Sequence, residues 1–463
     1  MSKIHVRSYL DNGAPQYDGL DRLAFIKLFR TVFAEESYII QHPRTLVVEP
    51  TSKTIQITFN ETPLFVEGHL IQIKDTDNNA FQSSSYRVLS VQNTTVIAKI
   101  DNYAEVVYPV SDSSLNIKVQ LADLGWDICW NTDSQFSMRS SNPKSSRNVF
   151  TLKTNNFAPA NTQVAAGTTS TKYATAFPVY VSRSIDTSTG SLIEDLTANT
   201  HNQYIGDSTT KQSLYFTWNS YSYSNSTTYS GLIPWYIIAS DKFFYIFVCH
   251  YSNNSSSITS SERNYYRNPD IGCSRYTYMF GDPDFLGDPD FVDSDGTLLQ
   301  ASYNTNWDSS VSMYGGRFTT MFNSNYTAGV RGNGYIYFAR DFETSFINQT
   351  PNNDLISASL FTVYGTSSGG GTAFPYPNKV TGGLLTFPIF VGRYMSGTNT
   401  GAYLRSTLPF CVYCLTTLTN LAGGNWPSFD YNLIKTSEGK LYLPIVTSAS
   451  ATSISNVALF ELD

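Results

Sequence analysis

The most acidic stretch of the chain has the residue types of a metal site. Residues 280–296 read Phe-Gly-Asp-Pro-Asp-Phe-Leu-Gly-Asp-Pro-Asp-Phe-Val-Asp-Ser-Asp-Gly, so six carboxylates fall between positions 282 and 295. Ca²⁺ takes several oxygen ligands, and calcium binding by the loop 282–295 is therefore one interpretation. The spacing departs from an EF-hand loop, because Phe291 stands where that loop needs its first carboxylate. A turn-rich, solvated loop is the alternative that we favour.

Two cysteines three residues apart could hold zinc or form a redox pair. Cys411 and Cys414 have that spacing, but no second cysteine pair or nearby histidine pair completes a zinc site. On a strand, the same spacing directs the two thiols to opposite faces. The other cysteines are isolated (Cys129, Cys249 and Cys273). We therefore predict no metal and no cofactor.

Carboxylates could also serve a glycosidase, which needs two of them about 5 or 6.5–9.5 Å apart. Asp127, Asp341 and Glu343 lie near strand-like, aromatic segments, but no motif pairs them. The chain has no phosphate-binding Gly-x-x-x-x-Gly-Lys loop and no Gly-x-Gly-x-x-Gly motif. Its histidines stand alone in the sequence (His5, His42, His69, His201 and His250). We expect a protein that is not an enzyme, with no catalytic residue.

The composition is typical of a β protein. The 463-residue chain has 32 Tyr and 29 Phe but only 14% charged residues, a mixture that suits pleated strands. The net charge of −7 argues against a nucleic-acid-binding surface, which needs clustered Lys and Arg. No apolar run of about 18 residues is present, so we expect no transmembrane span. The first residues lack the apolar segment of a signal peptide, which indicates synthesis in a cytosol.

One segment, residues 18–36, has helical periodicity. Asp18 stands at the N-cap position, and apolar residues follow at spacings of three and four. A second apolar face is more than a lone surface helix would bury. Either the rest of the chain covers this helix or another subunit does. On the second interpretation, residues 1–37 form an N-terminal arm and docking helix whose candidate subunit-docking side chains are Leu20, Leu23, Phe25, Ile26, Leu28, Phe29, Val32 and Phe33.

The remainder of the chain is predicted to be strands. Five short segments of period two separated by turn signals predict a small β-barrel or sandwich domain over residues 38–120. Residues 121–463 show no helical window and no internal repeat, which predicts one large irregular antiparallel β domain. Its most apolar stretch, 232–248, is interrupted by polar Ser240-Asp-Lys242, a pattern typical of a hairpin. The predicted fold class is mainly β.

A set of short motifs follows one order along the chain. With them, the chain resembles, over its whole length, a family of tailed-bacteriophage virion structural proteins. The loop at 281–296 and the Ser/Thr-rich stretches are longer than in that family, and the resemblance supplies no catalytic residue. The motifs are Tyr9-Leu-Asp-Asn-Gly-Ala-Pro-Gln16 with the helix at 19–35, Tyr86-Arg-Val-Leu-Ser-Val91, Leu124-Gly-Trp126, Pro234-Trp235 with Asp241-Lys-Phe-Phe-Tyr245, Phe280-Gly-Asp282, Phe374-Pro-Tyr-Pro-Asn378, Gly383-Leu-Leu385 and Leu404-Arg-Ser-Thr-Leu-Pro409.

The resemblance implies a virion component made in the host bacterial cytoplasm, in the tail or baseplate region rather than the head shell. Its expected partners are other virion proteins and further copies of itself, because symmetric particle subunits bury apolar and aromatic surface between copies. Capsid decoration is one alternative. Another is a receptor-binding role with a host surface glycan as partner, since aromatic rings can stack on sugars. A capsule-degrading glycosidase is the remotest alternative.

Overall fold

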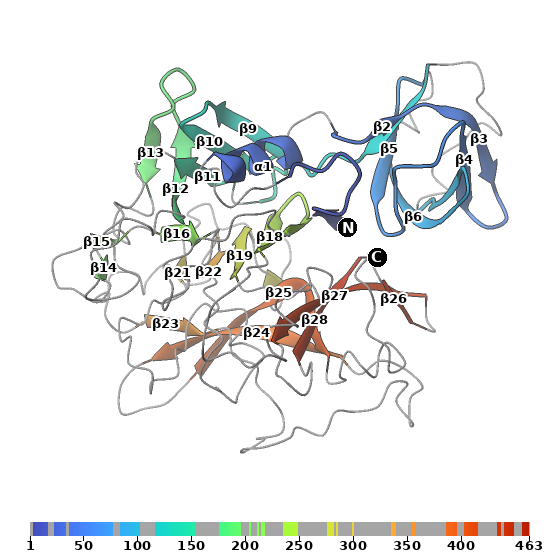
Figure 1. Ribbon diagram of the computed structural model, residues 1–463. Coiled ribbons are helices and arrows are strands. Elements are labelled where there is room, and N and C mark those ends of the chain that lie inside the picture. The colour runs from blue at the N-terminus through green and yellow to red at the C-terminus, as the bar shows by residue number, and fades with distance from the viewer. Residues whose placement is uncertain are drawn as a thin grey trace, which may run out of the picture.

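The computed structural model describes residues 3–16, 23–33, 37–76, 84–101, 116–145, 147–153, 176–195 and 235–248. Between residues 203 and 462 it also describes the other strands named below with a few flanking residues. Strands dominate these residues, and α1 (Ala24–Phe33) is their one helix (Figure 1). The predicted mainly β fold is confirmed. Of the helix predicted over residues 18–36, residues 24–33 are helical, Leu23 forms a turn, and residues 18–22 and 34–36 lie outside the described residues. No helix among the described residues has the length and apolar character needed to cross a membrane.

The small sheet is antiparallel and curls round its own core. Its two edge strands, β2 and β3, are separated along the chain only by His42, so one stretch of chain supplies both edges. Buried and exposed side chains alternate in β4, as expected for a sheet with one core face. The strand order is β2 (Ile40–Gln41), β8 (Lys118–Leu121), β5 (Leu70–Lys74), β6 (Ser85–Gln92), β7 (Thr95–Lys99), β4 (Thr54–Phe59) and β3 (Pro43–Glu49).

The middle sheet follows the small sheet along the chain and is also antiparallel. Its hydrogen-bonded order is β13 (Leu192–Asp195), β12 (Ala176–Ile185), β11 (Val149–Lys153), β10 (Gln135–Ser140) and β9 (Trp126–Asn131), with β16 (Leu214–Thr217) also paired to β12. The register of β9 on β10 shifts between Ser137 and Met138, which marks a β-bulge. A separate two-stranded sheet pairs β14 (Gln203–Tyr204) with β15 (Lys211–Gln212).

The hairpin sheet contains the predicted hairpin, which is confirmed. Strands β17 and β18 pair antiparallel, and the Ser240 amide donates to the Phe243 carbonyl across the turn (2.8 Å). The N-terminal strand β1 forms one edge of this sheet although more than 200 residues separate it from β17. The order is β1 (His5–Ser8), β17 (Trp235–Ala239), β18 (Phe243–Val248), β19 (Tyr276–Gly281), β22 (Tyr335–Phe338) and β21 (Leu299–Gln300), and only β19 and β22 run parallel.

The C-terminal sheet completes the described fold. Its order is β23 (Asp354–Ser357), β24 (Thr386–Met395), β25 (Ala402–Cys414), β28 (Asn456–Glu461), β27 (Leu441–Ser448) and β26 (Ile434–Lys435), with β20 (Asp284–Phe285) also paired to β25. The ring of Phe460 on β28 packs edge-on against Tyr245 of β18, with ring centroids 5.0 Å apart. The hairpin sheet and the C-terminal sheet therefore share packed aromatic side chains.

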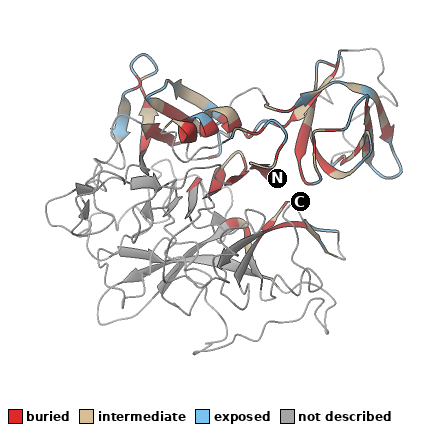
Figure 2. Cartoon of the chain, in the orientation of Figure 1, coloured by how far each residue is buried: buried red, intermediate tan, exposed pale blue. Residues whose placement is uncertain are grey.

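The packing of helix α1 explains why its sequence has two apolar faces. Phe29 packs against Phe136 and Phe150 of the middle sheet and against Phe244 of the hairpin sheet. Its ring thus contacts two sheets at once, and Figure 2 shows the helix as one of the most buried parts of the described chain. The side chains of the helix and of both sheets belong to one hydrophobic core.

Candidate functional site

Buried and half-buried polar side chains gather where the N-terminal arm meets the small sheet. We call this group the junction, and it consists of Arg7, Asp11, Tyr38, His69 and Arg87. Asp11 lies in the turn after β1 and is 4% exposed. Its Oδ2 accepts hydrogen bonds from the Ser8 amide (3.0 Å) and the Tyr38 hydroxyl (2.5 Å). Its Oδ1 lies 3.0 Å from Nε2 of His69, which is fully buried.

The backbone of the small sheet sets the tautomer of His69. The amide of Val66 donates to Nδ1 of His69 (3.3 Å), so Nδ1 is an acceptor and the ring proton is on Nε2. Nε2–H then donates to Oδ1 of Asp11. The Asp11 carboxylate thus accepts hydrogen bonds from three donors. Two of these donors lie next to strands of the small sheet: Tyr38 shortly before β2 and His69 directly before β5. Charge-assisted bonds of this kind are the stronger ones in proteins.

Tyr38 lies between the two hydrophobic cores and packs against both. Burial, together with the neighbouring Asp11 charge, raises the pKa of the Tyr38 hydroxyl well above its usual range. The hydroxyl consequently remains protonated and donates to Asp11 at any ordinary pH. Its chemistry here is that of a fixed hydrogen-bond donor, since a general base would need a pKa nearer the working pH.

Two arginines connect separate chain segments through backbone carbonyls. Arg87 on β6 donates from Nη1 to the Gly68 carbonyl (2.7 Å) and from Nη2 to the Ile4 carbonyl (2.7 Å). It also donates to the Leu462 carbonyl just after β28. One guanidinium therefore joins the arm, the small sheet and the end of the C-terminal sheet. Arg7 extends this contact by donating to the Ala122 carbonyl (2.5 Å) in the connection after β8.

A glycine lets these segments approach so closely. Gly68 has a φ of +90°, and a Cβ added there would come within 2.6 Å of the Leu433 side chain. Any other residue would thus be strained at this φ, and the end of the Leu433 side chain would have to move aside. The two ends of the chain lie close together in the Figure 1 view, in keeping with the hydrogen bonds of Arg87 to the Ile4 and Leu462 carbonyls.

His5, the first residue of β1, lies beside the junction. It is 7% exposed, and its Nδ1 is buried without a hydrogen-bond partner among the described residues. Burial, followed by the positive charges of Arg7, Arg87 and Lys3, lowers the pKa of His5 well below its usual range. The imidazole is consequently neutral in the folded protein.

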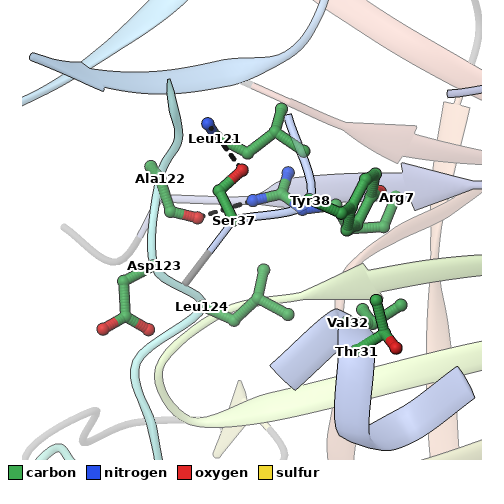
Figure 3. Close-up of a pocket in the computed structure, with 9 residues that line it drawn as sticks. All are labelled: Arg7, Thr31, Val32, Ser37, Tyr38, Leu121, Ala122, Asp123 and Leu124. Atoms are coloured by element: carbon green, nitrogen blue, oxygen red, sulfur yellow. Dashed lines mark hydrogen bonds between the residues drawn. The ribbon is translucent and has the colours of Figure 1, made fainter. Parts of the chain in front are cut away.

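The cavity beside the junction is small. Figure 3 shows it between the arm, helix α1 and residues 121–124, with the Arg7–Ala122 hydrogen bond along one wall. Its volume is about 10 Å³, which is close to the minimum for one water molecule. Ligand-binding pockets in proteins measure about 300–1,000 Å³. The cavity therefore suits a buried water, and the junction is suited to holding chain segments together.

Six of the eight predicted subunit-docking side chains are buried inside this chain. Leu20 is outside the described residues, and Leu23 is half-buried. The other six are at most 5% exposed and belong to a core that includes strands of the same chain: Phe25, Ile26, Leu28, Phe29, Val32 and Phe33. Coverage by the chain itself, the alternative that the sequence left open, accounts for this placement. Docking of a partner through these residues stays a prediction, and their burial argues against it.

The carboxylates considered for glycoside hydrolysis are not brought together by the described structure. Asp127 lies half-exposed on β9 and is held by arginines, with Arg147 Nη2 at 3.4 Å and Arg139 Nε at 3.7 Å from its Oδ2. Asp341 and Glu343 lie outside the described residues. Asp127 therefore has charge partners on the surface of the middle sheet and no described carboxylate beside it.

The described structure likewise does not bring the candidate metal ligands, the acidic loop and the two cysteines, into one site. Of the acidic loop 282–295, only Asp284 and Phe285 are described, as the short strand β20. Cys411 and Cys414 both lie on β25, and burial raises the pKa of the Cys411 thiol well above its usual range. Among the described residues, no group of three or more His, Cys, Asp and Glu side chains could hold a metal ion.

Sequence reasoning did not identify the junction. Asp11 belongs to a turn signal and His69 follows another, and 58 positions separate them. His69, like the other histidines, has no partner at a recognisable spacing. The only available signal was that Tyr86-Arg87 and Asp11 both lie in motifs of the phage-protein resemblance.

Comparison with known proteins provides no family assignment. No protein-family model matches the chain. No curated protein matches it either. Among solved structures, the chain aligns with the one titled "Phage phi92 endosialidase" at 9% sequence identity and a TM-score of 0.15. The alignment covers 80% of this chain and 70% of that chain. A TM-score this low does not establish a common fold, so this alignment carries no argument about function.

Proposed function

We propose that this chain is a structural component of a bacteriophage virion, in the tail or baseplate region, that assembles as a symmetric oligomer and has no catalytic activity. The phage assignment rests on the ordered motifs of the sequence. The structural role is supported by the positions of those motifs in the fold. Their described residues lie at contacts between separate parts of the chain.

The contact between the Leu124-Gly-Trp126 motif and the hairpin is the observation that carries the structural role. Trp126 Nε1 donates to the Ser240 carbonyl in the hairpin turn (2.8 Å). Gly125 has a φ of +78°, and a Cβ added there would lie 2.7 Å from Asp241 Cβ. The two motifs therefore fit directly against each other, and they join the middle sheet to the hairpin sheet.

Other motif residues make contacts of the same kind. Trp235 Nε1 donates to the Pro15 carbonyl of the arm (3.2 Å), and Asp11 and Arg87 form the junction. Phe280 packs on Trp126, with ring centroids 6.0 Å apart. Residues in these positions hold sheets together, and the pocket beside Arg7 has room for about one water molecule. They suit a subunit that has to keep one shape within a particle.

Purified particles provide the direct test. We expect mass spectrometry to find this chain in the virion and immunogold labelling to place it at the tail end. Light scattering on the purified chain should give an oligomer of defined size. A monomer that is absent from particles would overturn the proposal. So would release of reducing sugar from capsular polysaccharide by the purified chain.

Two aspartate variants make the test specific. Asp11→Ala removes the acceptor of the junction, so we expect subunits that fold but no longer hold the small sheet firmly against the rest of the chain, with loss of incorporation into particles. Asp127→Asn changes a half-exposed carboxylate of the middle sheet that is held only by surface arginines. We expect normal incorporation for Asp127→Asn. If a glycan or enzymatic role resided in Asp127, this second variant would instead lose host adsorption or activity while particles formed normally.

A further inference from the structure

Strand β1 forms an edge of the hairpin sheet, and the register shows which of its backbone groups face away from β17. The Tyr9 amide donates to the Trp235 carbonyl (3.1 Å). In an antiparallel pair, residues alternate between facing the partner strand and facing away from it. His5 and Arg7 therefore face β17, together with Tyr9. The backbone groups of Ile4, Val6 and Ser8 face outward.

Groups of the arm and of the small sheet form hydrogen bonds with these outward-facing backbone groups. The Ile4 carbonyl accepts from Arg87 Nη2 (2.7 Å), and the Val6 carbonyl accepts from Arg7 Nη1 (2.9 Å). The Ser8 amide donates to Asp11 Oδ2 (3.0 Å), and the Ser8 carbonyl accepts from the Asp11 amide (3.1 Å). Four outward groups of β1 and of the residue before it are thus satisfied without another strand.

The three side chains are held firmly in place. Arg7 and Arg87 are each 2% exposed, and Asp11 is 4% exposed. Each also has a second anchor: Arg7 on the Ala122 carbonyl, Arg87 on the Gly68 carbonyl and Asp11 on His69. A strand added to this edge would have to displace buried charged groups from these partners. Leaving such groups unpaired in the interior is costly, so the addition is strongly disfavoured.

Unpaired sheet edges are templates for strands from other chains, and natural proteins often protect them with charged side chains. The risk is greatest for a subunit present at high local concentration. We propose that Arg7, Asp11 and Arg87 form an edge block, which prevents a second copy of this chain from adding a strand to the hairpin sheet at β1. Assembly of copies then uses other surfaces, and loss of the block makes β1 a self-association site.

The test compares Arg87→Met with the wild-type chain by sedimentation velocity across a wide concentration range. We expect the variant to form species larger than the wild-type assembly, in amounts that rise with concentration. Hydrogen exchange should then show protection of the β1 amides in those species. Arg183→Met is the matched control, because Arg183 on β12 pairs with Glu194 (2.9 Å) and is 35% exposed. This control should sediment as the wild type does.

A second substitution separates edge pairing from general misfolding. Ile4→Pro removes the outward amide of the residue before β1 but leaves the groups that face β17 unchanged, and proline is tolerated at the start of an edge strand. In the Arg87→Met background, Ile4→Pro should reduce association if copies pair through this edge. Aggregation of misfolded chains would instead increase, since Ile4 is a buried apolar residue.

The outcomes decide the inference whatever the size of the wild-type assembly. Arg87→Met that sediments as wild type, or whose association rises on adding Ile4→Pro, overturns the edge block. If circular dichroism shows that Arg87→Met does not fold, the same pair of measurements is made with Arg7→Met, which frees the Val6 carbonyl. A wild-type chain that is absent from virions would overturn the proposed function and leave the edge block unaffected.

Discussion

At the residue scale, the Asp11 carboxylate is the acceptor on which the junction depends. Removing one of its donors, as in Tyr38→Phe, should lower the free energy of unfolding by about 1.5–3 kcal/mol, the usual contribution of a hydrogen bond to a charged group. Urea unfolding measures this loss. Tyr442→Phe is the control, since its hydroxyl lies 3.4 Å from Glu461 Oε2 in a looser contact. Equal losses in the two variants would show that the Asp11 contact has no special weight.

His5 gives the junction a predictable pH dependence. Its folded pKa is lowered, so the folded protein binds fewer protons than the unfolded chain once the pH falls below the ordinary histidine pKa of about 6.5. Stability contributed by neutral His5 is therefore fully present above pH about 6.5 and is progressively lost as the pH falls below it. The slope for one proton is at most about 1.4 kcal/mol per pH unit.

The His5→Gln variant isolates this effect, because glutamine stays neutral across the same pH range. We expect thermal unfolding curves of the variant to change less between neutral and mildly acidic pH than those of the wild type. The other ionisable groups are present in both proteins, so the difference between the two profiles reports His5. Parallel profiles would mean that protonated His5 is accommodated in the folded chain.

At the element scale, helix α1 is a core element that contacts two sheets. Phe29→Ala removes a fully buried ring that packs on Phe136, Phe150 and Phe244, so it should cost about 3–5 kcal/mol of stability. Lys27→Ala, on the exposed side of the same helix, should cost far less. Both values come from denaturant unfolding. The double variant Phe25→Asp with Phe29→Asp should unfold the whole core, whereas a folded but unassembled protein would restore the docking interpretation.

The same helix shows how far the sequence predicts the structure. The helix could be predicted because apolar residues recur at helical spacing. The hairpin could be predicted because a polar turn divides an apolar stretch. The sequence did not predict what covers the second apolar face of α1. An apolar face looks alike whether the same chain or another subunit buries it.

The junction was equally beyond sequence reasoning. Asp11 and His69 meet only because β1 pairs with β17 and the small sheet then lies beside the arm. Such tertiary contacts leave no local pattern. The barrel or sandwich expected for residues 38–120 had a clearer signal, since the inward residues of β4 and β7 alternate. The extent of that region as a separate domain stays a prediction.

At the scale of the whole molecule, two hydrophobic cores meet at the junction. The small sheet has its own core, and helix α1 shares the other with the middle and hairpin sheets. Tyr38 packs against both cores, while Asp11, Arg7 and Arg87 provide the polar bonds between them. We therefore expect cooperative unfolding of the two cores to depend on a few buried polar contacts.

Asp11→Ala should separate the unfolding of the two cores. It leaves the Ser8 amide, the Tyr38 hydroxyl and His69 Nε2–H without their acceptor, and each buried donor left unsatisfied typically costs about 1–3 kcal/mol. All six tryptophans lie outside residues 37–121, so tryptophan fluorescence reports only on the rest of the chain. Hydrogen exchange of peptides from 39–121 reports on the small sheet.

In the wild type, we expect both probes to give the same urea midpoint, because the junction couples the two cores. In Asp11→Ala, the two midpoints should differ, with one core unfolding before the other. Asp127→Ala, which removes a half-exposed carboxylate of the middle sheet, should keep the midpoints together. Coincident midpoints in Asp11→Ala would mean that apolar packing around Tyr38 couples the cores without the carboxylate. Separate midpoints in the wild type would mean that the junction joins two parts that fold independently.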